Sequence, residues 1–414
     1  MGQSPAHHRD WSHLSITMLE RMEKTVTDAI YPATRKVSTR TLLFALLLST
    51  VMMIMLYFRH SSEPASLGYV QHQVRFKGRV PLLPEEDPQF IYGDRIDAQL
   101  AHQPAGDLHS ALIYQQIEDN AEQTMWLVEE CPVKCMMTNM DAHITAAEAL
   151  IFTPDFIDRI PLNRPPQQLW FLQLLESPVN TPTLVEFNGN INYTISYRWD
   201  ADFVSPYGRY MAFPKPKVVW DESMSRKTKN VVWFVSHCLT ANHRLEYAKK
   251  LGTYIDVEIF GECGQGKRSA AEMRQMLTND FKFYLAFENS NCGDYVTEKF
   301  FENALRNDIV PIVMGAPKQD YLKIAPTNSF IHVDDYEDAE HLAQYLKYLS
   351  SNASAYNEYF AWKKLGRLED SKLPCRICLF LQNPTHKVYE DVDFWWHGKK
   401  ECMYAAEPPA PFIQ

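Results

Sequence analysis

The chain has 414 residues, a mass of 48.0 kDa and a formal net charge of −10. This length exceeds one small core, so two domains of ordinary size behind a linker are expected. Hydrophobic residues make up 46% and charged residues 22%, which excludes wholesale disorder because enough apolar surface is available for burial. Lys and Arg number 41 against 51 Asp and Glu, so no nucleic-acid partner is expected.

One segment near the N-terminus is suited to a membrane. Thr41–Phe58 carries no charge over 18 residues, and as a helix it spans roughly 27 Å, enough for a thin bilayer. Forty residues precede it, unlike the short leader of a cleaved signal peptide. Basic residues concentrate on its N-terminal side, which predicts a cytosolic tail over 1–40, a signal anchor over 41–58 and a lumenal remainder. A buried core helix is the alternative, disfavoured because Leu and Met cover every face.

The rest of the chain divides into four parts by composition. Residues 59–105 contain scattered prolines and little periodicity, which predicts an extended stem without chemistry. The anchor or stem also offers a surface for a homodimer. An α/β domain is expected over 106–220 and a second over 221–370, followed by a C-terminal tail over 371–414 that carries Cys-x-x-Cys.

All eight cysteines follow the expected anchor and so lie in what would be an oxidising compartment, where disulfides are the default. Cys131 with Cys135 and Cys375 with Cys378 could instead form a four-thiolate zinc site. The spacing of Cys131 and Cys135 is loose for such a site. Their partners cannot be deduced from spacing. The disulfide candidates are Cys131, Cys135, Cys375, Cys378 and Cys402. Two sequons, at Asn192 and Asn352, would accept glycans in the secretory lumen.

Strands and helices alternate along the second domain. Strands are expected at 231–236, 255–261, 281–289 and 309–315, with SFIHVDD following. The first helix is expected from Leu245, Ala248 and Leu251 on one face, and later helices at SAAEMRQML, VTEKFFENALRN and AEHLAQYLKYL. Thr240 is the expected N-cap of the first helix. Such alternation predicts a doubly wound parallel sheet, whose ligands bind beyond the carboxyl ends of the strands. In the first domain, apolar runs at 147–152 and 168–175 are expected to be buried strands.

Two cations lie where such a sheet binds anions. Arg244 follows the first strand and Lys299 lies early in the helix after the third, so a diphosphate is the expected guest near helix N-termini. The alternative for either residue alone is a solvated helix charge. Asp294, Tyr295 and Glu298 bring carboxyls and a ring to the turn of Lys299, as sugar hydroxyls require.

Other phosphate chemistries lack their motifs. Neither the P-loop GxxxxGK[ST] nor a GxGxxG after the first strand occurs, which disfavours ATPase and dehydrogenase functions. Two Asp-x-Asp triplets, Asp200–Asp202 and Asp391–Asp393, lie outside the nucleotide-type domain and are interpreted as structural. No metal site is therefore predicted, and a divalent metal is expected to be at most stimulatory because cationic side chains can meet leaving-group charge.

The run FYLAFENSNCGDYVTEKFFENALRNDIVPIVMGAPKQDY (283–321), followed by SFIHVDDY (329–336), closely resembles the signature of the α1,3-fucosyltransferases, glycosyltransferase family 10, of invertebrate type. Further matches occur in the family's order: ESP at 176–178, YTISYRWDADFVSPYG at 193–208, VSHC at 235–238 and VEIFGECG at 257–264. The resemblance implies the GT-B fold, two Rossmann-like domains facing across a cleft, with GDP-fucose in the C-terminal one and the acceptor on the N-terminal side.

The resemblance also implies the roles of individual residues. Glu176 matches the carboxylate assigned as general base, and Arg244 and Lys299 match the diphosphate-binding pair. Residues matching those around the nucleotide and fucose are Ser236, Tyr284, Asn289, Tyr295 and Glu298. The implied reaction is inverting transfer of L-fucose from GDP-β-L-fucose to the 3-hydroxyl of N-acetylglucosamine in glycoprotein N-glycans, without a required cofactor, by a single-pass type II protein of the Golgi membrane.

Inversion by one displacement independently requires one base on the acceptor side. The alternative function is a lumenal protein of the same fold that binds a nucleotide sugar or glycan without turnover. The acceptor stays open between core N-glycan and Lewis-type N-acetylglucosamine.

Overall fold

The computed structural model describes residues 93–104, 106–116, 122–155, 163–217, 227–398 and Cys402. The expected anchor at 41–58 and most of the expected stem lie outside these residues. Within them, no helix combines the length and apolar character needed to cross a bilayer.

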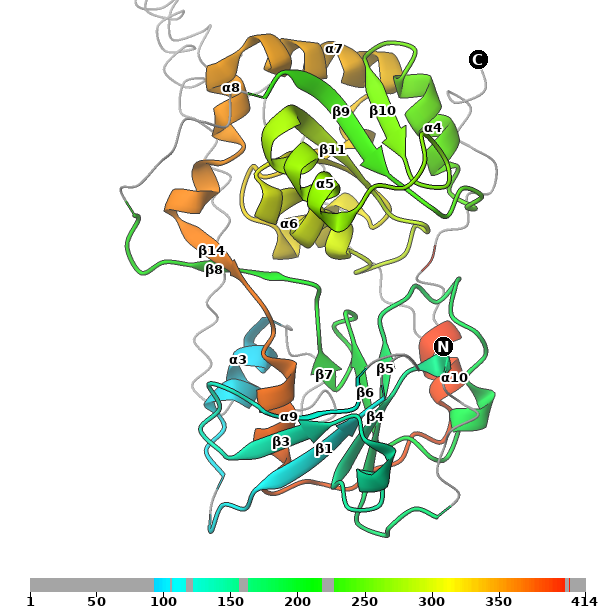
Figure 1. Ribbon diagram of the computed structural model, residues 1–414, viewed down its shortest axis with the longest axis vertical. Coiled ribbons are helices and arrows are strands. Elements are labelled where there is room, and N and C mark those ends of the chain that lie inside the picture. The colour runs from blue at the N-terminus through cyan, green and yellow to red at the C-terminus, as the bar shows by residue number, and fades with distance from the viewer. Residues whose placement is uncertain are drawn as a thin grey trace, which may run out of the picture. The chain divides into compact units, whose positions relative to one another are not determined.

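A seven-stranded sheet organises the first half of the described chain, and this sheet with the helices packed on it is called here the N-terminal lobe (Figure 1). Its strand order is β2-β3-β1-β4-β5-β6-β7, and every neighbouring pair is parallel except β2 with β3. The strands are β1 (Ala111–Gln115), β2 (Met125–Leu127), β3 (Cys135–Thr138), β4 (Ala149–Phe152), β5 (Leu169–Leu174), β6 (Tyr193–Ser196) and β7 (Phe203–Val204). The two expected strands at 147–152 and 168–175 are thus present as β4 and β5.

Strand β4 shows why this sheet is buried on both sides. All four of its residues are buried. Ala149 and Ile151 belong to the core that includes helix α9, whereas Leu150 and Phe152 belong to the opposite core with Trp170. A near-continuous apolar run is what a parallel strand covered on both faces requires. The lobe's helical segments are α3 (Gly93–Ala101), α9 (Leu373–Leu381), α10 (Val392–His397), η2 (Asp141–His143) and η4 (Val185–Phe187).

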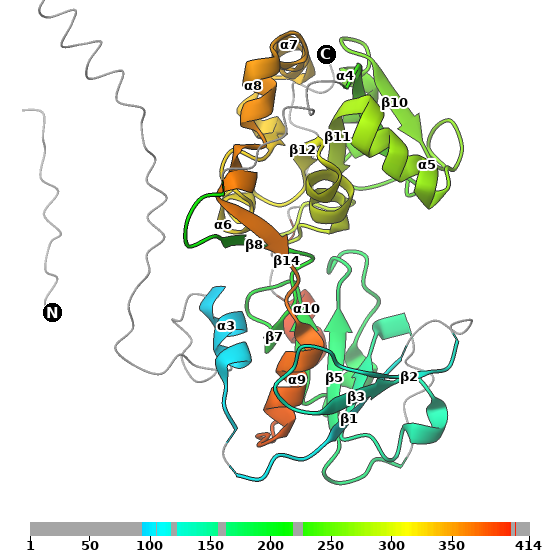
Figure 2. The ribbon, with the colours of Figure 1, turned by 60° about the vertical axis from the view of Figure 1, so that its left-hand side comes forward.

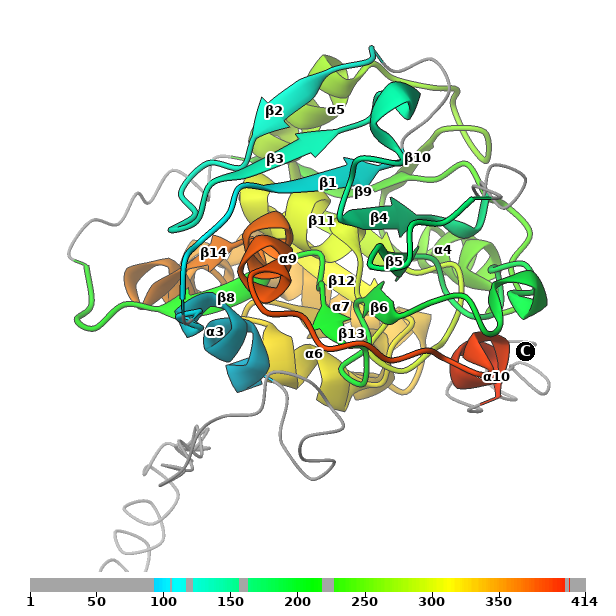
Figure 3. The same cartoon turned by 90° about the horizontal axis from the view of Figure 1, so that it is seen from below.

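Three of these helices differ from the expected domain plan. Residues 93–101, expected in an extended stem, form α3, which packs beside α9 (Figure 3). Buried Gln99 donates a hydrogen bond to the Asp202 carbonyl at 3.1 Å and accepts one from Arg376 at 2.9 Å. Likewise, α9 and α10 from the expected tail contribute to the cores of the N-terminal lobe. The three helices lie on this lobe because their apolar faces are buried there. Local composition does not show which surface an apolar face will meet.

A five-stranded, fully parallel sheet organises the second half, and with its helices it is called the C-terminal lobe. Its order is β10-β9-β11-β12-β13, so the strand order reverses between β9 and β11. The doubly wound prediction and the α/β fold class are confirmed. The strands are β9 (Lys229–Phe234), β10 (Val257–Phe260), β11 (Phe281–Phe287), β12 (Val310–Met314) and β13 (Ile331–His332). The α-helices are α4 (Arg244–Leu251), α5 (Ala270–Gln275), α6 (Lys318–Ile324), α7 (Ala339–Ser351) and α8 (Ala353–Glu358).

Two helical expectations need correction here. The N-cap of α4 is His243, in the left-handed conformation with φ of 53°, and not Thr240, whose hydroxyl instead donates to Asn242. The expected helix over VTEKFFENALRN is a π-helical turn, η7 (Lys299–Ala304), followed by a 3-10 turn, η8 (Leu305–Asn307). Wide turns of this kind occur often at functional sites. The remaining short helical segments are η6 (Met276–Asp280), η9 (Val333–Asp335) and η10 (Ala361–Lys364).

A two-stranded antiparallel ribbon joins the chain leaving the N-terminal lobe to the chain returning to it (Figure 2). It pairs β8 (Arg209–Ala212) with β14 (Gly366–Glu369).

The expectation of disulfides is confirmed, and all eight cysteines are paired. The bonds are Cys131–Cys375, Cys135–Cys378, Cys238–Cys263 and Cys292–Cys402. The first two tie the start of β3 and the turn before it to α9, which excludes the four-thiolate zinc alternative.

Candidate active site

The carboxyl ends of β9 and β11 mark the point where the strand order of the C-terminal lobe reverses. In open parallel sheets, ligands bind in the crevice outside such a reversal. Ser236 lies exposed just beyond β9, and Asn289 lies half-buried just beyond β11. Both are expected donor-site residues, and the topology brings them to this one edge.

Arg244 links these two strand ends directly. Its guanidinium donates to the Phe287 carbonyl at 2.7 Å and to the His237 carbonyl at 2.9 Å. The residue is only 3% exposed, and this burial lowers the pKa of its guanidinium below the ordinary value. The side chain of Arg244 therefore joins the ends of β9 and β11 as well as carrying a positive charge. From the sequence, only the charge was expected.

Lys299 is more accessible than Arg244. Its ammonium lies 2.9 Å from the carboxylate of Glu288 and 3.1 Å from that of Glu298, and 19% of its side chain is exposed. Burial lowers the pKa of Lys299, but the two carboxylates outweigh that effect and raise it well above the ordinary range. Lys299 is thus a permanent cation at the start of η7.

Glu288 is a site residue that received no role from the sequence. It is fully buried, and its carboxylate also accepts hydrogen bonds from the backbone N–H and hydroxyl of Thr297, each 2.9 Å long. Gly315 lies against it at φ of 144°, and a Cβ atom there would come within 2.6 Å of the Glu288 Cβ. A polar residue directly after a buried strand was the available signal.

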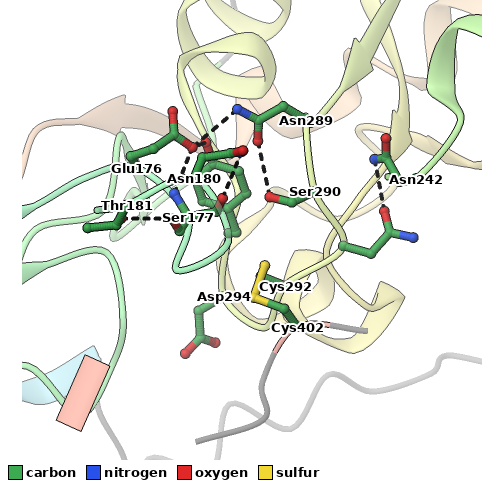
Figure 4. Close-up of a disulfide and its surroundings, with 12 residues drawn as sticks. Glu176, Ser177, Asn180, Thr181, Asn242, Asn289, Ser290, Cys292, Asp294 and Cys402 are labelled. Atoms are coloured by element: carbon green, nitrogen blue, oxygen red, sulfur yellow. Dashed lines mark hydrogen bonds between the residues drawn. A yellow bond between two sulfur atoms is a disulfide. The ribbon is translucent and has the colours of Figure 1, made fainter. Parts of the chain in front are cut away.

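Glu176 brings the N-terminal lobe into this network. It lies exposed just beyond β5, and one oxygen, Oε1, accepts three hydrogen bonds (Figure 4). The donors are the Tyr295 hydroxyl at 2.7 Å, the Ser177 N–H at 2.7 Å and the Asn289 amide at 3.2 Å. Among the described residues, no hydrogen bond reaches the other oxygen, Oε2. Two donors from the loop after β11 therefore orient a carboxylate of the other lobe and leave one oxygen open.

These hydrogen bonds influence the protonation of Glu176, and the charge of Glu176 influences that of Tyr295. Partial burial raises the pKa of Glu176, but the bonds from Tyr295, Ser177 and Asn289, with the charge of Lys299, outweigh burial and lower the pKa below its usual value. Burial, helped by the neighbouring carboxylates of Glu288 and Glu176, raises the pKa of Tyr295, so its hydroxyl stays a donor. Glu176 is thus an ionised carboxylate at neutral pH.

Two residues selected from the sequence are buried. Tyr284 is in the middle of β11, with its hydroxyl accepting from Asn303 of η7 at 3.2 Å, and burial raises its pKa to about 12. The charges of Lys299, Glu298 and Glu288 also act on this hydroxyl, so Tyr284 lies beneath the site and its contact with the donor stays a prediction. Asn192 is 3% exposed; its amide oxygen accepts from the Trp170 N–H at 2.8 Å and its amide nitrogen donates to the Lys387 carbonyl at 2.6 Å. Its expected glycan has no room in the folded lobe, whereas Asn352 is half-buried at the start of α8.

The Asp-x-Asp triplets have structural partners. Asp200 pairs with Arg198 at 2.7 Å, and the fully buried Asp202 pairs with Lys387 at 2.7 Å. Asp391 caps α10, and Asp393 accepts from the Leu184 N–H at 2.6 Å. In the described ranges no cluster of three His, Cys, Asp or Glu side chains suits a metal ion.

A cavity of about 500 Å³ lies elsewhere, beside the first turn of α9. Trp126, Glu130 and Lys372 line it, and Glu176 and the donor-site residues do not. Its position gives no reason to connect it with the network around Glu176.

Comparison with known proteins identifies the family. The family described as "Glycosyltransferase family 10 (fucosyltransferase) C-term" matches residues 224–395, and "Fucosyltransferase, N-terminal" matches residues 109–208. Glycoprotein 3-alpha-L-fucosyltransferase A of Drosophila melanogaster is 37% identical over 359 residues, which cover 81% of this chain and 70% of that protein. The chain belongs to the family 10 fucosyltransferases. The family resemblance and the expectation of an enzyme are thereby confirmed.

A second relative agrees with this assignment. Alpha-(1,3)-fucosyltransferase C of Drosophila melanogaster is 35% identical over 300 residues, which cover 64% of this fucosyltransferase and 70% of that relative. A solved α1,3-fucosyltransferase with GDP aligns over 72% of the chain and 98% of its own, at 14% identity and a TM-score of 0.46.

Proposed function

We propose that this fucosyltransferase moves L-fucose from GDP-β-L-fucose to the 3-hydroxyl of N-acetylglucosamine in glycoprotein N-glycans, with inversion and with Glu176 as general base. The observation that carries the proposal is the Glu176 carboxylate, held through Oε1 by Asn289 and Tyr295 while Oε2 is open. This contact brings the proposed acceptor-side base next to the edge of the parallel sheet that carries Lys299 and Arg244. A relative whose name specifies glycoprotein substrates and a 3-α linkage supports this acceptor class.

In the proposed reaction, the acceptor hydroxyl oxygen attacks C1 of fucose as the bond from C1 to the β-phosphate oxygen breaks. The electron pair of that bond leaves with GDP, and the hydroxyl proton passes to Oε2 of Glu176. A positioned base contributes about 10²- to 10⁴-fold to such a step. Lys299 and Arg244 are the groups that meet the charge developing on the diphosphate, and preorganised cations act most strongly on charge that appears in the transition state.

The remaining donor roles belong to the same proposal. Ser236, Asn289, Tyr295 and Glu298 are assigned to the nucleotide and fucose. The proposed GT-B arrangement has an acceptor-side domain over 106–220, completed by α3, α9 and α10, and a donor domain over 221–370. We assign the uncharged segment 41–58 to a Golgi membrane anchor of type II topology, with the described lobes in the lumen. Homodimer formation through the anchor or stem is part of this proposal.

A transfer assay tests the function. The full chain in mild detergent is incubated with labelled GDP-fucose and two glycopeptides, one offering only core N-acetylglucosamine and one offering only antennal N-acetyllactosamine. Transfer of label, removable by an α1,3-specific fucosidase and competed by GDP but not by UDP, is the expected result. Hydrolysis of donor without transfer to either acceptor would overturn it.

The same assay tests the metal requirement. Because Lys299 and Arg244 are cations already at the site, EDTA is expected to leave substantial activity. Complete loss that a divalent metal restores would contradict the absence of a required metal.

A further inference from the structure

The loop that follows β11 is packed into the other lobe. Cys292 and Tyr295, which are 1% and 2% exposed, belong to the same core cluster as Trp170, Tyr197 and Trp396 of the N-terminal lobe. The rings of Tyr197 and Tyr295 lie 5.1 Å apart between centroids. The loop therefore carries donors of the C-terminal lobe into a core that belongs to the sheet bearing Glu176.

A disulfide attaches this loop to the C-terminal segment (Figure 4). Cys292 is bonded to Cys402, and the two residues also form an isolated antiparallel bridge. Cys402 follows α10 in the chain, and α10 is firmly seated, since Val392 and Trp396 are fully buried. The disulfide thus links the loop to a helix fixed on the N-terminal lobe.

Side-chain hydrogen bonds hold α10 in place. The Asn188 amide oxygen accepts from the Val392 N–H at 2.8 Å and from the Asp393 N–H at 3.2 Å. Asp393 in turn accepts from the Leu184 N–H at 2.6 Å. These bonds connect α10 to the segment around η4. Cys402 itself packs against the core cluster that contains Trp396 and Trp170, so the disulfide ends on the N-terminal lobe.

Hydrogen bonds also hold the loop on both sides of Cys292. Before it, the buried Asn242 amide donates to the Asn291 side chain at 3.0 Å and to the Glu288 carbonyl at 2.9 Å. Asp294, at φ of 59°, donates through its N–H to Asp320 at 2.9 Å, and the Thr297 N–H is bound by Glu288. The disulfide at Cys292 lies between Asn289 and Tyr295, the two loop residues that donate to Oε1 of Glu176. It is therefore placed to restrain both donors at once.

We propose that the Cys292–Cys402 disulfide is a positioning element for fucosyl transfer, holding the 289–295 loop so that Tyr295 and Asn289 orient the Glu176 carboxylate. The inference rests on the proposed role of Glu176 as base. Cys292 and Cys402 touch neither donor nor acceptor and act through Tyr295. A misplacement of about 1 Å in a positioned catalytic group can cost 10²-fold in rate. The cations Lys299 and Arg244 are held by Glu288 and by backbone carbonyls, so their placement does not depend on this bond.

The test separates rate from donor binding. In the full chain, Cys292→Ala/Cys402→Ala is expected to lower kcat by about 10-fold or more. GDP binding should weaken by a clearly smaller factor, because Lys299 and Arg244 keep their partners although Asn289 and Tyr295 also belong to the proposed donor site. The matched control is Cys131→Ala/Cys375→Ala, which removes a disulfide remote from the site while Cys135–Cys378 still joins the same elements. Its kcat should equal that of the wild type.

A double-mutant cycle tests the route. If the disulfide acts through the Tyr295 hydroxyl, adding Tyr295→Phe to the disulfide variant should lower kcat little further than the larger single effect. Fully additive losses would overturn the proposal, as would parallel loss of kcat and GDP binding. If Cys292→Ala/Cys402→Ala fails to fold, Asn188→Ala provides a second test. It removes the hydrogen bonds that hold α10 while the disulfide stays intact, and it should also lower kcat.

The two proposals fail differently. If Glu176→Gln abolishes transfer while the disulfide variant keeps the wild-type kcat, positioning by the disulfide is wrong and the base assignment stands. If Glu176→Gln transfers fucose normally, the base assignment is wrong, and any loss in the disulfide variant has another origin.

Discussion

The ammonium of Lys299 lies 2.9 Å from the fully buried carboxylate of Glu288. Burial raises the pKa of Glu288, and the charge of Lys299 opposes that rise. Each group therefore depends on the other, because an unpaired charge at this depth would be costly. The cation proposed to meet the diphosphate is held by a residue at the end of a strand.

Glu288→Gln should destabilise the protein and weaken transfer. The amide can keep the hydrogen bond from the Thr297 N–H but presents a donor to the ammonium, so a loss of roughly 3 kcal/mol in unfolding free energy is expected from breaking a buried pair. Urea denaturation measures it. Glu302→Gln, at an exposed pair with Arg306, is the control and should cost under about 1 kcal/mol. Equal stabilities for the two variants would contradict the pairing argument.

Glu176→Gln should lower kcat by at least about 10²-fold, the usual contribution of a positioned base. The amide oxygen can replace Oε1 and keep the bonds from Tyr295, Ser177 and Asn289, while the amide nitrogen replaces Oε2 and accepts no proton. GDP affinity should therefore change by well under tenfold. Steady-state kinetics and calorimetric titration with GDP measure both quantities. A glutamine variant with near-normal kcat would direct attention to Glu298 or Asp294.

Tyr295→Phe should shift the acid limb of the kcat/KM profile to higher pH. The tyrosine hydroxyl is the hydrogen-bond donor that contributes most to lowering the pKa of Glu176. Without it the pKa rises, so the base becomes protonated, and inactive, at a higher pH than in the wild type. Tyr359→Phe is the control, because its hydroxyl pairs with Tyr345 away from the site. An acid limb that does not move would separate Tyr295 from the protonation of Glu176.

Only Asn352 should carry an N-glycan in the secretory pathway. Ser354→Ala removes its sequon yet keeps the Asn352 side chain, which accepts from the Ala355 N–H and caps α8. Expression in secretory cells followed by endoglycosidase should shift the wild type by one glycan and leave Ser354→Ala unshifted. A residual shift would indicate modification at Asn192. No shift in either protein would contradict a lumenal location.

The Cys131–Cys375 and Cys135–Cys378 disulfides should stabilise the fold non-additively. They span 244 and 243 residues and close nearly the same loop, so removing either one leaves the loop closed. Removing both should cost on the order of 5 kcal/mol in the chain-entropy estimate, and removing one much less. Alanine variants of each pair and of both, compared by denaturant unfolding, measure this. Equal stepwise losses would contradict the shared-loop argument.

The sequence predicted the C-terminal lobe well because its strands and helices alternate with clear periodicity, and parallel pairing follows from that alternation. Arg244, Asn289 and Lys299 could be selected because they follow strand ends, and parallel sheets bring those ends to one edge. The motif match did not show that Tyr284 is fully buried, because burial depends on the elements packed on β11. Thr240 is not the cap of α4 because the helix begins only at Arg244, after His243 in the left-handed conformation.

By itself, the sequence determined the α/β class, the family and the strand-end residues, since these depend on local periodicity and on a long contiguous motif. Only the tertiary structure decided that α3, α9 and α10 pack on the first sheet, that Asn192 is buried, and that Cys292 pairs with Cys402, because such pairings join residues far apart in the chain and depend on which apolar faces meet. The contact of Tyr295 with Glu176 spans 119 residues. A local sequence pattern does not predict a contact over such a separation, and the orientation of the proposed base depends on this contact.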